Sequence, residues 1–355
     1  MNRLEKLFKV LPAETECVLI SSDINRRYFS GMKSSAGYIL AFREKGYLLI
    51  DFRYYEKAVC TVSSCDVVLM KSFKNQALEL LRKHGVKKIS IESDTVTVSQ
   101  LDSYKNVFEG FEIDFSHNLS KAISSLRAVK SEDEIKKITA AQRIAERAFE
   151  NILNFIRPGI SEKEISLELD FYMLKNGAEA LSFDTIALTG KNTSLPHGIP
   201  SDDTVKNGSL VLMDFGAVYD GYHSDMTRTV CVGEPDFEMR EIYALVLSAQ
   251  NSALEFAKEG IKGCELDKIA RDIIAKNGYG DYFGHSLGHG VGLEIHEFPN
   301  ASVASEAVFA KNMVVTVEPG IYIPGKFGVR IEDFVVIKED FAENLTKCPK
   351  NLICL

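Results

Sequence analysis

Acidic side chains at the ends of apolar runs are the residues in this sequence best placed to do chemistry. Asp214 ends the run 210–213, and Asp225 opens the alternating stretch 226–230. The turn residues Asp220-Gly221 between them predict a hairpin that places the two carboxylates side by side. A carboxylate at the end of a buried strand is costly unless it is paired, hydrogen-bonded or bound to a metal. The hairpin therefore predicts a partner for both charges.

A second pair of acids repeats this pattern later in the chain. Glu318 ends the apolar run 313–317, and after a turn the stretch 329–334 predicts a strand. In that strand Arg330 and Glu332 would point to the same side, because successive side chains alternate. Four carboxylates brought together without cations would repel one another and could not all ionise. A bound cation is the simplest way to balance them.

Histidines are concentrated in the same part of the chain, since five of the seven lie between residues 197 and 296. His285 and His289 share the glycine-rich stretch 284–292, which matches neither the HExxH helix of zinc proteases nor a GxGxxG nucleotide loop. An extended strand would place both imidazoles on one face. One imidazole with four carboxylates favours Mn(II), Co(II) or Fe(II) over a thiolate zinc site. The set is large enough for two ions, which together could lower the pKa of a water molecule and polarise a carbonyl.

The elements that would position these residues also occur twice. One helix is predicted between Gly159 and Gly177 and another between Gly260 and Gly278, with Lys-Asn before each closing glycine. Each of these helices follows a longer one and precedes a stretch of strands. The first long helix begins at the capping box 131–134 and is predicted to run to about residue 156. We therefore interpret the C-terminal part as an internal duplication, with helix, helix and hairpin in each half.

The first 125 residues form a separate, smaller α/β domain in this interpretation. No catalytic groups cluster in it. Strands are predicted at 17–20, 36–42, 47–51, 67–70 and 88–91, and a helix at 75–84. A chain of 355 residues favours two domains. We place the boundary in a linker near 126–130, which gives domains 1–125 and 126–355.

Composition narrows the functional class. The formal net charge of −8 argues against a nucleic-acid partner, which would require a basic face. The N-terminus lacks a signal-like apolar core, and no apolar run approaches the roughly 18 residues of a membrane span. We therefore expect a cytoplasmic protein without a membrane partner. The seven scattered cysteines, with no CxxC pair, indicate free thiols.

Five short stretches together resemble the M24 metallopeptidases of pita-bread fold, in particular the branch of Xaa-Pro aminopeptidases and proline dipeptidases (prolidases). They are Asp214–Gly216, Ser224–Thr229, Gly288–Gly290, Glu318–Gly320 and Arg330–Asp333. Stretches 25–31 and 49–55 are similar to the N-terminal domain of that branch. The resemblance implies an α/β (α+β) fold. A creatinase-like N-terminal domain would precede a pita-bread catalytic domain that contains a pseudo-twofold duplication.

The resemblance also implies a role for each candidate residue. Two divalent ions, usually Mn or Co, would be bound by Asp214, Asp225, His289, Glu318 and Glu332, with Asp225 and Glu332 bridging. Glu318 would also take the proton of the attacking hydroxide. His197, His285 and His296 match family histidines that position the scissile carbonyl and stabilise the tetrahedral intermediate. Of these three, His197 and His296 would also bind substrate. Arg330 and Tyr322 are expected to hold the substrate, although a packed strand position explains Tyr322 equally well.

The reaction that this resemblance implies is metal-assisted hydrolysis of the peptide bond before proline. The chain matches the family at every ligand position, which disfavours a metal-free binding protein or a creatinase-like enzyme on the same scaffold. A methionine aminopeptidase would not need the extra N-terminal domain. We predict an Xaa-Pro aminopeptidase acting on Xaa-Pro peptides, with an Xaa-Pro dipeptidase as the alternative. A homodimer is expected, because members of the family often form one.

Overall fold

The computed structural model describes residues 2–355, which form two compact units, one up to Arg127 and one from Ala128 to Leu355. Each unit contains its own cluster of buried apolar residues. Helix α6 (Asn118–Ala128) occupies part of the stretch that was predicted as a linker. Across residues 2–355, every helix is too short or too polar to cross a lipid bilayer.

A six-stranded mixed sheet forms the centre of the N-terminal unit, in the order β4-β3-β2-β1-β5-β6. Its strands are β1 (Cys17–Ile20), β2 (Tyr38–Phe42), β3 (Gly46–Ile50), β4 (Asp66–Leu69), β5 (Lys88–Ile91) and β6 (Glu112–Asp114). The other helices of this unit are α1 (Arg3–Val10), α2 (Asp23–Ser30), α3 (Phe52–Thr61), α4 (Phe73–Lys83) and α5 (Val98–Val107). The predicted strands and the predicted helix are confirmed with small shifts at their ends. The remaining helices and β6 were not predicted.

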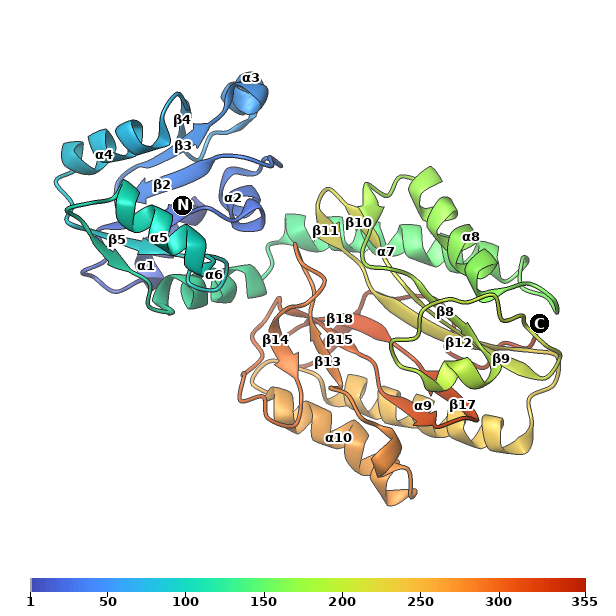
Figure 1. The fold of residues 1–355 in the computed structure, drawn as a ribbon. Helices are drawn as coiled ribbons and strands as arrows, with labels where there is room; N and C mark the ends of the chain where they lie inside the picture. The colour runs from blue at the N-terminus through green and yellow to red at the C-terminus, as the bar shows by residue number, and fades with distance from the viewer. Residues whose placement is uncertain (1) are drawn as a thin grey trace. The chain divides into compact units, whose positions relative to one another are not determined.

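The second unit is built from two similar halves, each of which begins with a pair of helices (Figure 1). The four helices are α7 (Glu132–Ile152), α8 (Glu162–Lys175), α9 (Phe237–Phe256) and α10 (Gly263–Lys276). Helices α8 and α10 both have 14 residues, and each is followed by a glycine with positive φ, Gly177 or Gly278. The predicted duplication is confirmed, although α7 is shorter than predicted and ends at Ile152.

Strands lie between these two pairs of helices. In Figure 1, α7 and α8 run along one side of the strands, and α9 and α10 run along the other. The larger sheets have the orders β12-β9-β8 and β14-β13-β15-β18-β19, and the smaller ones are β11-β10-β7 and β16-β17. Their bounds are β7 (Ala180–Leu181), β8 (Ile186–Thr189), β9 (Ser209–Phe215), β10 (Ala217–Tyr219), β11 (Tyr222–His223), β12 (Met226–Val232), β13 (Gly288–Gly290), β14 (Glu297–Ala301), β15 (Val314–Val317), β16 (Gly320–Ile323), β17 (Phe327–Arg330), β18 (Asp333–Ile337) and β19 (Ala342–Asn344).

The hairpin predicted around Asp214 and Asp225 is present. Strands β9 and β12 pair antiparallel, with Asp214 opposite Thr227. Beyond them β10 and β11 continue the hairpin to the turn Asp220-Gly221, where both residues have positive φ (44° and 79°). Two left-handed residues are what a two-residue type I′ turn requires, and its twist matches that of the flanking strands. The turn chemistry therefore fixes the register that sets the two aspartates near each other.

The second half repeats this arrangement with one difference from the prediction. Strands β15 and β18 pair antiparallel, and the shorter strands β16 and β17 continue beyond them. The prediction of one strand over 329–334 was wrong, because the chain changes partner at Ile331 and Glu332. Residues up to Arg330 pair with β16, whereas those from Asp333 pair with β15. At the break, the Glu332 N–H donates to the carbonyl of Thr227 in the first half.

Candidate active site

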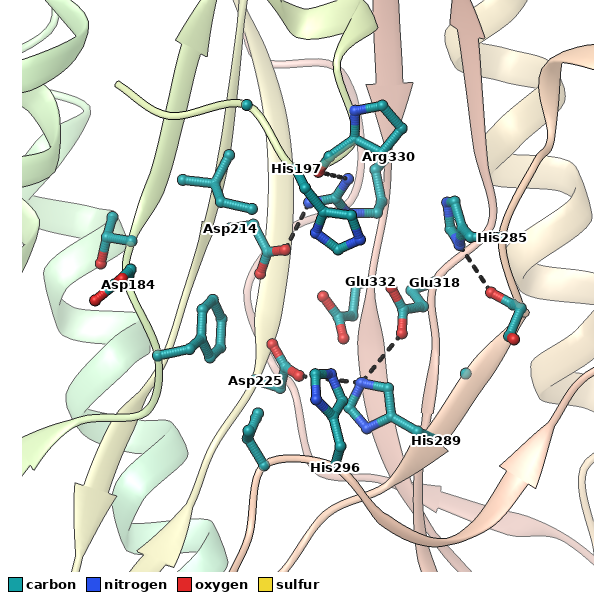
Figure 2. Close-up of a pocket in the computed structure, with 18 of the residues that line it drawn as sticks. Asp184, His197, Asp214, Asp225, His285, His289, His296, Glu318, Arg330 and Glu332 are labelled. Atoms are coloured by element: carbon teal, nitrogen blue, oxygen red, sulfur yellow. Dashed lines mark hydrogen bonds and ion pairs between the residues drawn. The ribbon is translucent and has the colours of Figure 1, made fainter. Parts of the chain in front are cut away.

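A cavity of about 660 Å³ in the second unit collects the residues singled out in the sequence (Figure 2). The predicted residues in its wall are His197, Asp214, Asp225, His285, His289, His296, Glu318, Arg330 and Glu332. Tyr322 does not belong to this wall. It is buried, and its hydroxyl contacts Arg330 and His285. Tyr322 thus occupies a packed position, and its expected contact with substrate stays a prediction.

Ligand-type side chains converge at the centre of this cavity from both halves of the unit (Figure 2). Asp225 directly precedes β12, His289 is in β13, and Glu332 lies between β17 and β18. Each offers one nitrogen or oxygen atom within 4.8 Å of the others. Asp225 and Glu332 are 4% and 1% exposed. Residues distant in sequence thus form a compact group able to hold a cation.

The imidazole of His289 is oriented in the manner of a metal ligand. Its Nδ1 lies 3.1 Å from the carbonyl oxygen of Gly290, which can only accept, so we assign the Nδ1 proton to this bond. Its Nε2 faces the acids, 3.3 Å from Oε1 of Glu318 and 3.6 Å from Oδ2 of Asp225. A hydrogen bond from the far nitrogen to a carbonyl is the usual way in which proteins orient a metal-binding histidine.

The protein alone supplies too little positive charge to balance the carboxylates in the cavity. Burial, reinforced by neighbouring carboxylates, raises the pKa of Asp225 and of Glu332 well above their ordinary values. Burial also raises the pKa of Asp214, despite the opposing charge of Arg330. Burial acts against the charged forms of His289 and Glu318 too. The hydrogen bond and attraction between these two nevertheless raise the pKa of His289 to about 9 and lower that of Glu318 to about 2.

Two carboxylate oxygens in this group indicate whether a divalent cation fits the cavity. Oδ1 of Asp214 and Oε1 of Glu332 are buried and accept no hydrogen bond within residues 2–355. Buried carboxylate oxygens without a partner are costly, and a hard divalent cation satisfies them directly. Together with the raised carboxylate pKa values and the orientation of His289 Nε2 toward the acids, these oxygens show that the residues present fit a metal centre.

Arg330 holds this group from one side. It is 3% exposed, and its Nη2 donates to Oδ2 of Asp214 at 2.5 Å. Its Nε donates to the hydroxyl of Thr227 at 3.0 Å, and that hydroxyl in turn donates to Oε2 of Glu332 at 2.7 Å. Arg330 therefore donates to the acids and to the groups beside them, and its expected contact with substrate stays a prediction.

Tyr322 connects Arg330 to His285. Its hydroxyl accepts from Nη1 of Arg330 at 2.8 Å and lies 2.9 Å from Nε2 of His285. Because Nδ1 of His285 donates to the carbonyl of Ser286, Nε2 is the acceptor and the Tyr322 hydroxyl is the donor. Burial raises the pKa of Tyr322 to about 12, so this proton stays in place at neutral pH. His285 precedes β13, so the extended strand predicted to carry both His285 and His289 is too long.

Two threonines that contact the acids were not predicted. Thr227 donates to Glu332, and Thr316 donates to Oε1 of Glu318 at 3.0 Å. Thr316 also accepts from the backbone N–H of His289 at 3.0 Å. Each threonine lies two positions from an acid, Thr227 after Asp225 and Thr316 before Glu318. That spacing, which places two side chains on one face of a strand, is the signal that would have found them.

The last two candidate histidines lie at the exposed side of the cavity. His296 packs edge-on against His289, with ring centroids 4.3 Å apart. Burial lowers the pKa of His296, which favours the neutral imidazole at physiological pH. His197 follows the short helix η1 (Gly190–Ser194) and is exposed. Both are accessible to a molecule that enters the cavity.

Comparison with known protein families shows which family this chain belongs to. Residues 136–339 match the family described as Metallopeptidase family M24. The chain belongs to the M24 metallopeptidases. Residues 3–129 of this M24 enzyme match the Creatinase/Prolidase N-terminal domain. The predicted family and the predicted fold, a creatinase-like domain followed by a pita-bread domain, are confirmed, and so is the prediction of a peptide-bond hydrolase.

Relatives that match the chain along its whole length indicate which enzymes within the family it is similar to. The M24 chain is 43% identical over 357 residues to an Xaa-Pro dipeptidase from Pyrococcus furiosus, covering 99% of both sequences. A solved Xaa-Pro dipeptidase from Bacillus anthracis is 41% identical, with a TM-score of 0.95 and 99% of each chain covered. A solved X-Pro aminopeptidase from Thermotoga maritima is 38% identical, with a TM-score of 0.93 and all of both chains covered.

Proposed function

We propose that this M24 metallopeptidase is an Xaa-Pro dipeptidase (prolidase) that uses two divalent ions, Mn or Co. The observation that carries the proposal is the full-length similarity, above 40% identity, to dipeptidases from two organisms. The five expected ligand side chains that face one cavity support it. We predicted an aminopeptidase from the sequence, with the dipeptidase as the alternative, and these relatives support the dipeptidase better.

The residues proposed to hold the ions are the four acids and His289. Asp225 and Glu332 are the natural shared ligands, since they are the most deeply buried of the acids and come from different halves. When bound, the ions would lower the pKa of a water molecule and polarise the scissile carbonyl. Arg330 and Thr227 orient Asp214 and Glu332, so the carboxylates need little rearrangement on binding.

Glu318 is the proposed proton carrier. Its carboxylate is ionised in this environment, and Oε1 is held by the Thr316 hydroxyl at 3.0 Å. Glu318 can accept the proton of the attacking water and then deliver it to the prolyl nitrogen. That delivery matters because the bond before proline is a tertiary amide, whose nitrogen must gain a proton as it leaves.

Histidines on the exposed side of the cavity are proposed to receive the substrate. His296 and His197 are available to donate to the scissile carbonyl or to the prolyl carboxylate of a dipeptide. Such donors stabilise the negative charge that develops on the carbonyl oxygen. His285 differs, because both of its ring nitrogens are already hydrogen-bonded to Tyr322 and Ser286. We assign it to the cavity wall and not to direct proton transfer.

The apolar part of the wall suits a proline ring. It is formed by Phe183, Ile186, Pro196, Pro200 and Ile295. A pocket of a few hundred cubic ångströms with apolar walls and a few polar groups is typical of small-ligand sites. A dipeptide offers the ring, a carbonyl and a free carboxylate to this set of groups.

An aminopeptidase is the second candidate, because the Thermotoga maritima X-Pro aminopeptidase is also similar along its whole length. The two activities differ in whether the prolyl carboxylate is free. Metal-free protein reloaded with Mn or Co should be offered Ala-Pro, Ala-Pro-Ala and, as a control without proline, Ala-Ala. Hydrolysis of Ala-Pro alone would support the dipeptidase. Preferential cleavage of Ala-Pro-Ala would replace it with the aminopeptidase, and metal-loaded protein that cleaves neither would refute both.

A further inference from the structure

Arg228 is a buried cation with no role in the proposed chemistry. It is in β12 and only 1% exposed. A guanidinium has five N–H donors, and all five are used. The acceptors are the carbonyl oxygens of Thr227 (2.9 Å), Glu332 (2.5 Å), Cys348 (3.0 Å) and Pro349 (2.9 Å), and Oδ1 of Asp333 (2.7 Å).

These bonds join the two halves of the unit directly behind the acids. Nη1 of Arg228 donates both to Thr227 in the first half and to Glu332 in the second. At the same point the N–H of Glu332 donates to the carbonyl of Thr227 at 3.1 Å. Thr227 is two residues from Asp225, so the bonds of Arg228 join the backbone beside Asp225 to the backbone of Glu332.

Asp333 completes the arrangement. It is 0% exposed, and its carboxylate also accepts from Asn344 Nδ2 at 2.7 Å and pairs with Lys350 Nζ at 3.1 Å. Arg228 and Asp333 therefore form a buried ion pair, with 2.7 Å between Nη2 and Oδ1. Buried ion pairs seldom add net stability compared with apolar packing, so a geometric role is a better reason for this one.

We propose that Arg228 is a positioning residue for the metal centre. By holding the carbonyl oxygens of Thr227 and Glu332 on one planar fork, it sets the separation of the Asp225 and Glu332 carboxylates and hence the affinity for the cations. This inference rests on the proposed metal site. Lysine cannot replace the arginine, because an ammonium donates from a single point and cannot span acceptors on three segments.

The chain offers a matched control in the other unit. Arg26 is also 1% exposed and also uses all five donors. Its acceptors are the Ser34 hydroxyl, the carbonyl oxygens of Ser21, Ser34 and Gly37, and Oδ1 of Asp23. All of them belong to the N-terminal unit. Arg26→Lys therefore imposes a similar structural loss without touching the proposed ligands.

The test compares R228K with R26K in the full chain. Stability is measured by urea unfolding, and Mn²⁺ affinity by calorimetric titration of the metal-free proteins. Both variants should be less stable than the wild type. R228K should bind Mn²⁺ at least about tenfold more weakly, in the range found for residues that orient metal ligands. R26K should bind Mn²⁺ like the wild type. With saturating Mn²⁺, R228K should lower kcat more than it changes KM.

Several outcomes would overturn the proposal. Wild-type affinity in R228K, or an equal loss in R26K, would refute a specific positioning role. Wild-type protein that binds no Mn²⁺ would refute the metal site itself, and the inference with it. Should R228K fail to fold, D333N gives the second measurement, because it removes the anionic partner while nearly conserving shape. D333N should also weaken Mn²⁺ binding by about tenfold or more, and unchanged affinity in D333N would refute the proposal.

Discussion

The hydroxyl of Thr227 donates to Oε2 of Glu332 at 2.7 Å, across 105 residues of sequence. Because the same oxygen accepts from Nε of Arg330, its single proton is directed to Glu332. The bond fixes one oxygen of Glu332. The other, Oε1, stays buried and accepts no hydrogen bond within residues 2–355. Oε1 is thereby presented as the oxygen that a cation would take.

Thr227→Val tests this relationship with a side chain of the same shape. The valine leaves Nε of Arg330 and Oε2 of Glu332 without a partner, which should cost about 1–3 kcal/mol of unfolding free energy. Mn²⁺ affinity should fall about tenfold or more, because Glu332 can rotate. Thr227→Ser keeps the hydroxyl and should restore most of the affinity. Equal Mn²⁺ affinities for the valine and serine variants would contradict the assignment.

Asp225→Asn should abolish peptidase activity and metal loading while leaving the fold intact. Asparagine keeps the shape of the side chain but loses the charge that a shared ligand needs. The metal-free variant should be at least as stable as metal-free wild type near neutral pH, because burial and neighbouring acids raise the pKa of Asp225 and make its ionised form costly. Metal content and thermal unfolding measure the two effects. A fully active variant would refute the assignment.

Removal of the metal should make stability fall as pH rises. Asp225 and Glu332 have raised pKa values, and that of His289 is raised from 6.5 to about 9. Groups with raised pKa bind protons more tightly in the folded chain, so the contribution of His289 is fully present below pH 6.5 and lost as pH rises through about 9. Chelated protein should therefore unfold at lower urea concentration at about pH 9 than at about pH 6.

Saturating Mn²⁺ should remove this dependence, because the cation replaces the proton among the acids. The same urea titrations with Mn²⁺ in place of chelator provide the comparison. Asp225→Asn should flatten the slope of the chelated protein, since one of the groups responsible is gone. Chelated wild-type protein whose stability stays constant or rises over this range would show that the acids are balanced in another way.

Gly288→Ala should disrupt the centre through the backbone. A Cβ at position 288 would lie 2.0 Å from the carbonyl oxygen of Thr316, so β13 and with it His289 would have to move. Gly284, four residues earlier, has nothing within 4 Å of its Cβ position and is the matched control. We expect Gly288→Ala to lower Mn²⁺ affinity and kcat/KM by an order of magnitude or more. Gly284→Ala should change neither, and identical behaviour of the two variants would contradict this account.

The acids could be predicted because each ends or begins a run of apolar or alternating residues, a pattern that is visible locally. The partner of each acid could not be predicted in this way. Asp225 and Glu332 meet because two duplicated halves fold onto each other. The repeated pattern predicted that the four acids share a cation, but only the family resemblance singled out this pair as shared ligands. The strand break at Ile331 was missed because the alternation of side chains continues through it, while the pairing partner changes.

The contacts of Arg228 also could not be predicted from the sequence. Four of its five acceptors are backbone carbonyl oxygens, which every residue carries, so no residue type marks them in a sequence. Thr227 and Thr316 lie within reach of pattern analysis, because they are two positions from an acid on a strand. The choice between dipeptidase and aminopeptidase depends on the shape of loops around the cavity, where no short motif applies.

The bonds from Arg228 to Cys348 and Pro349 also impose an order on the synthesis of the enzyme. These carbonyl groups are translated 120 and 121 residues after the arginine that they accept from. During translation, Arg228 is synthesised before these two acceptors exist, as are Asp214 and Asp225. A nascent chain that ends before residue 348 therefore lacks two of the five acceptors of Arg228, and the group behind the acids is complete only when the last residues of the chain have folded back onto the hairpin.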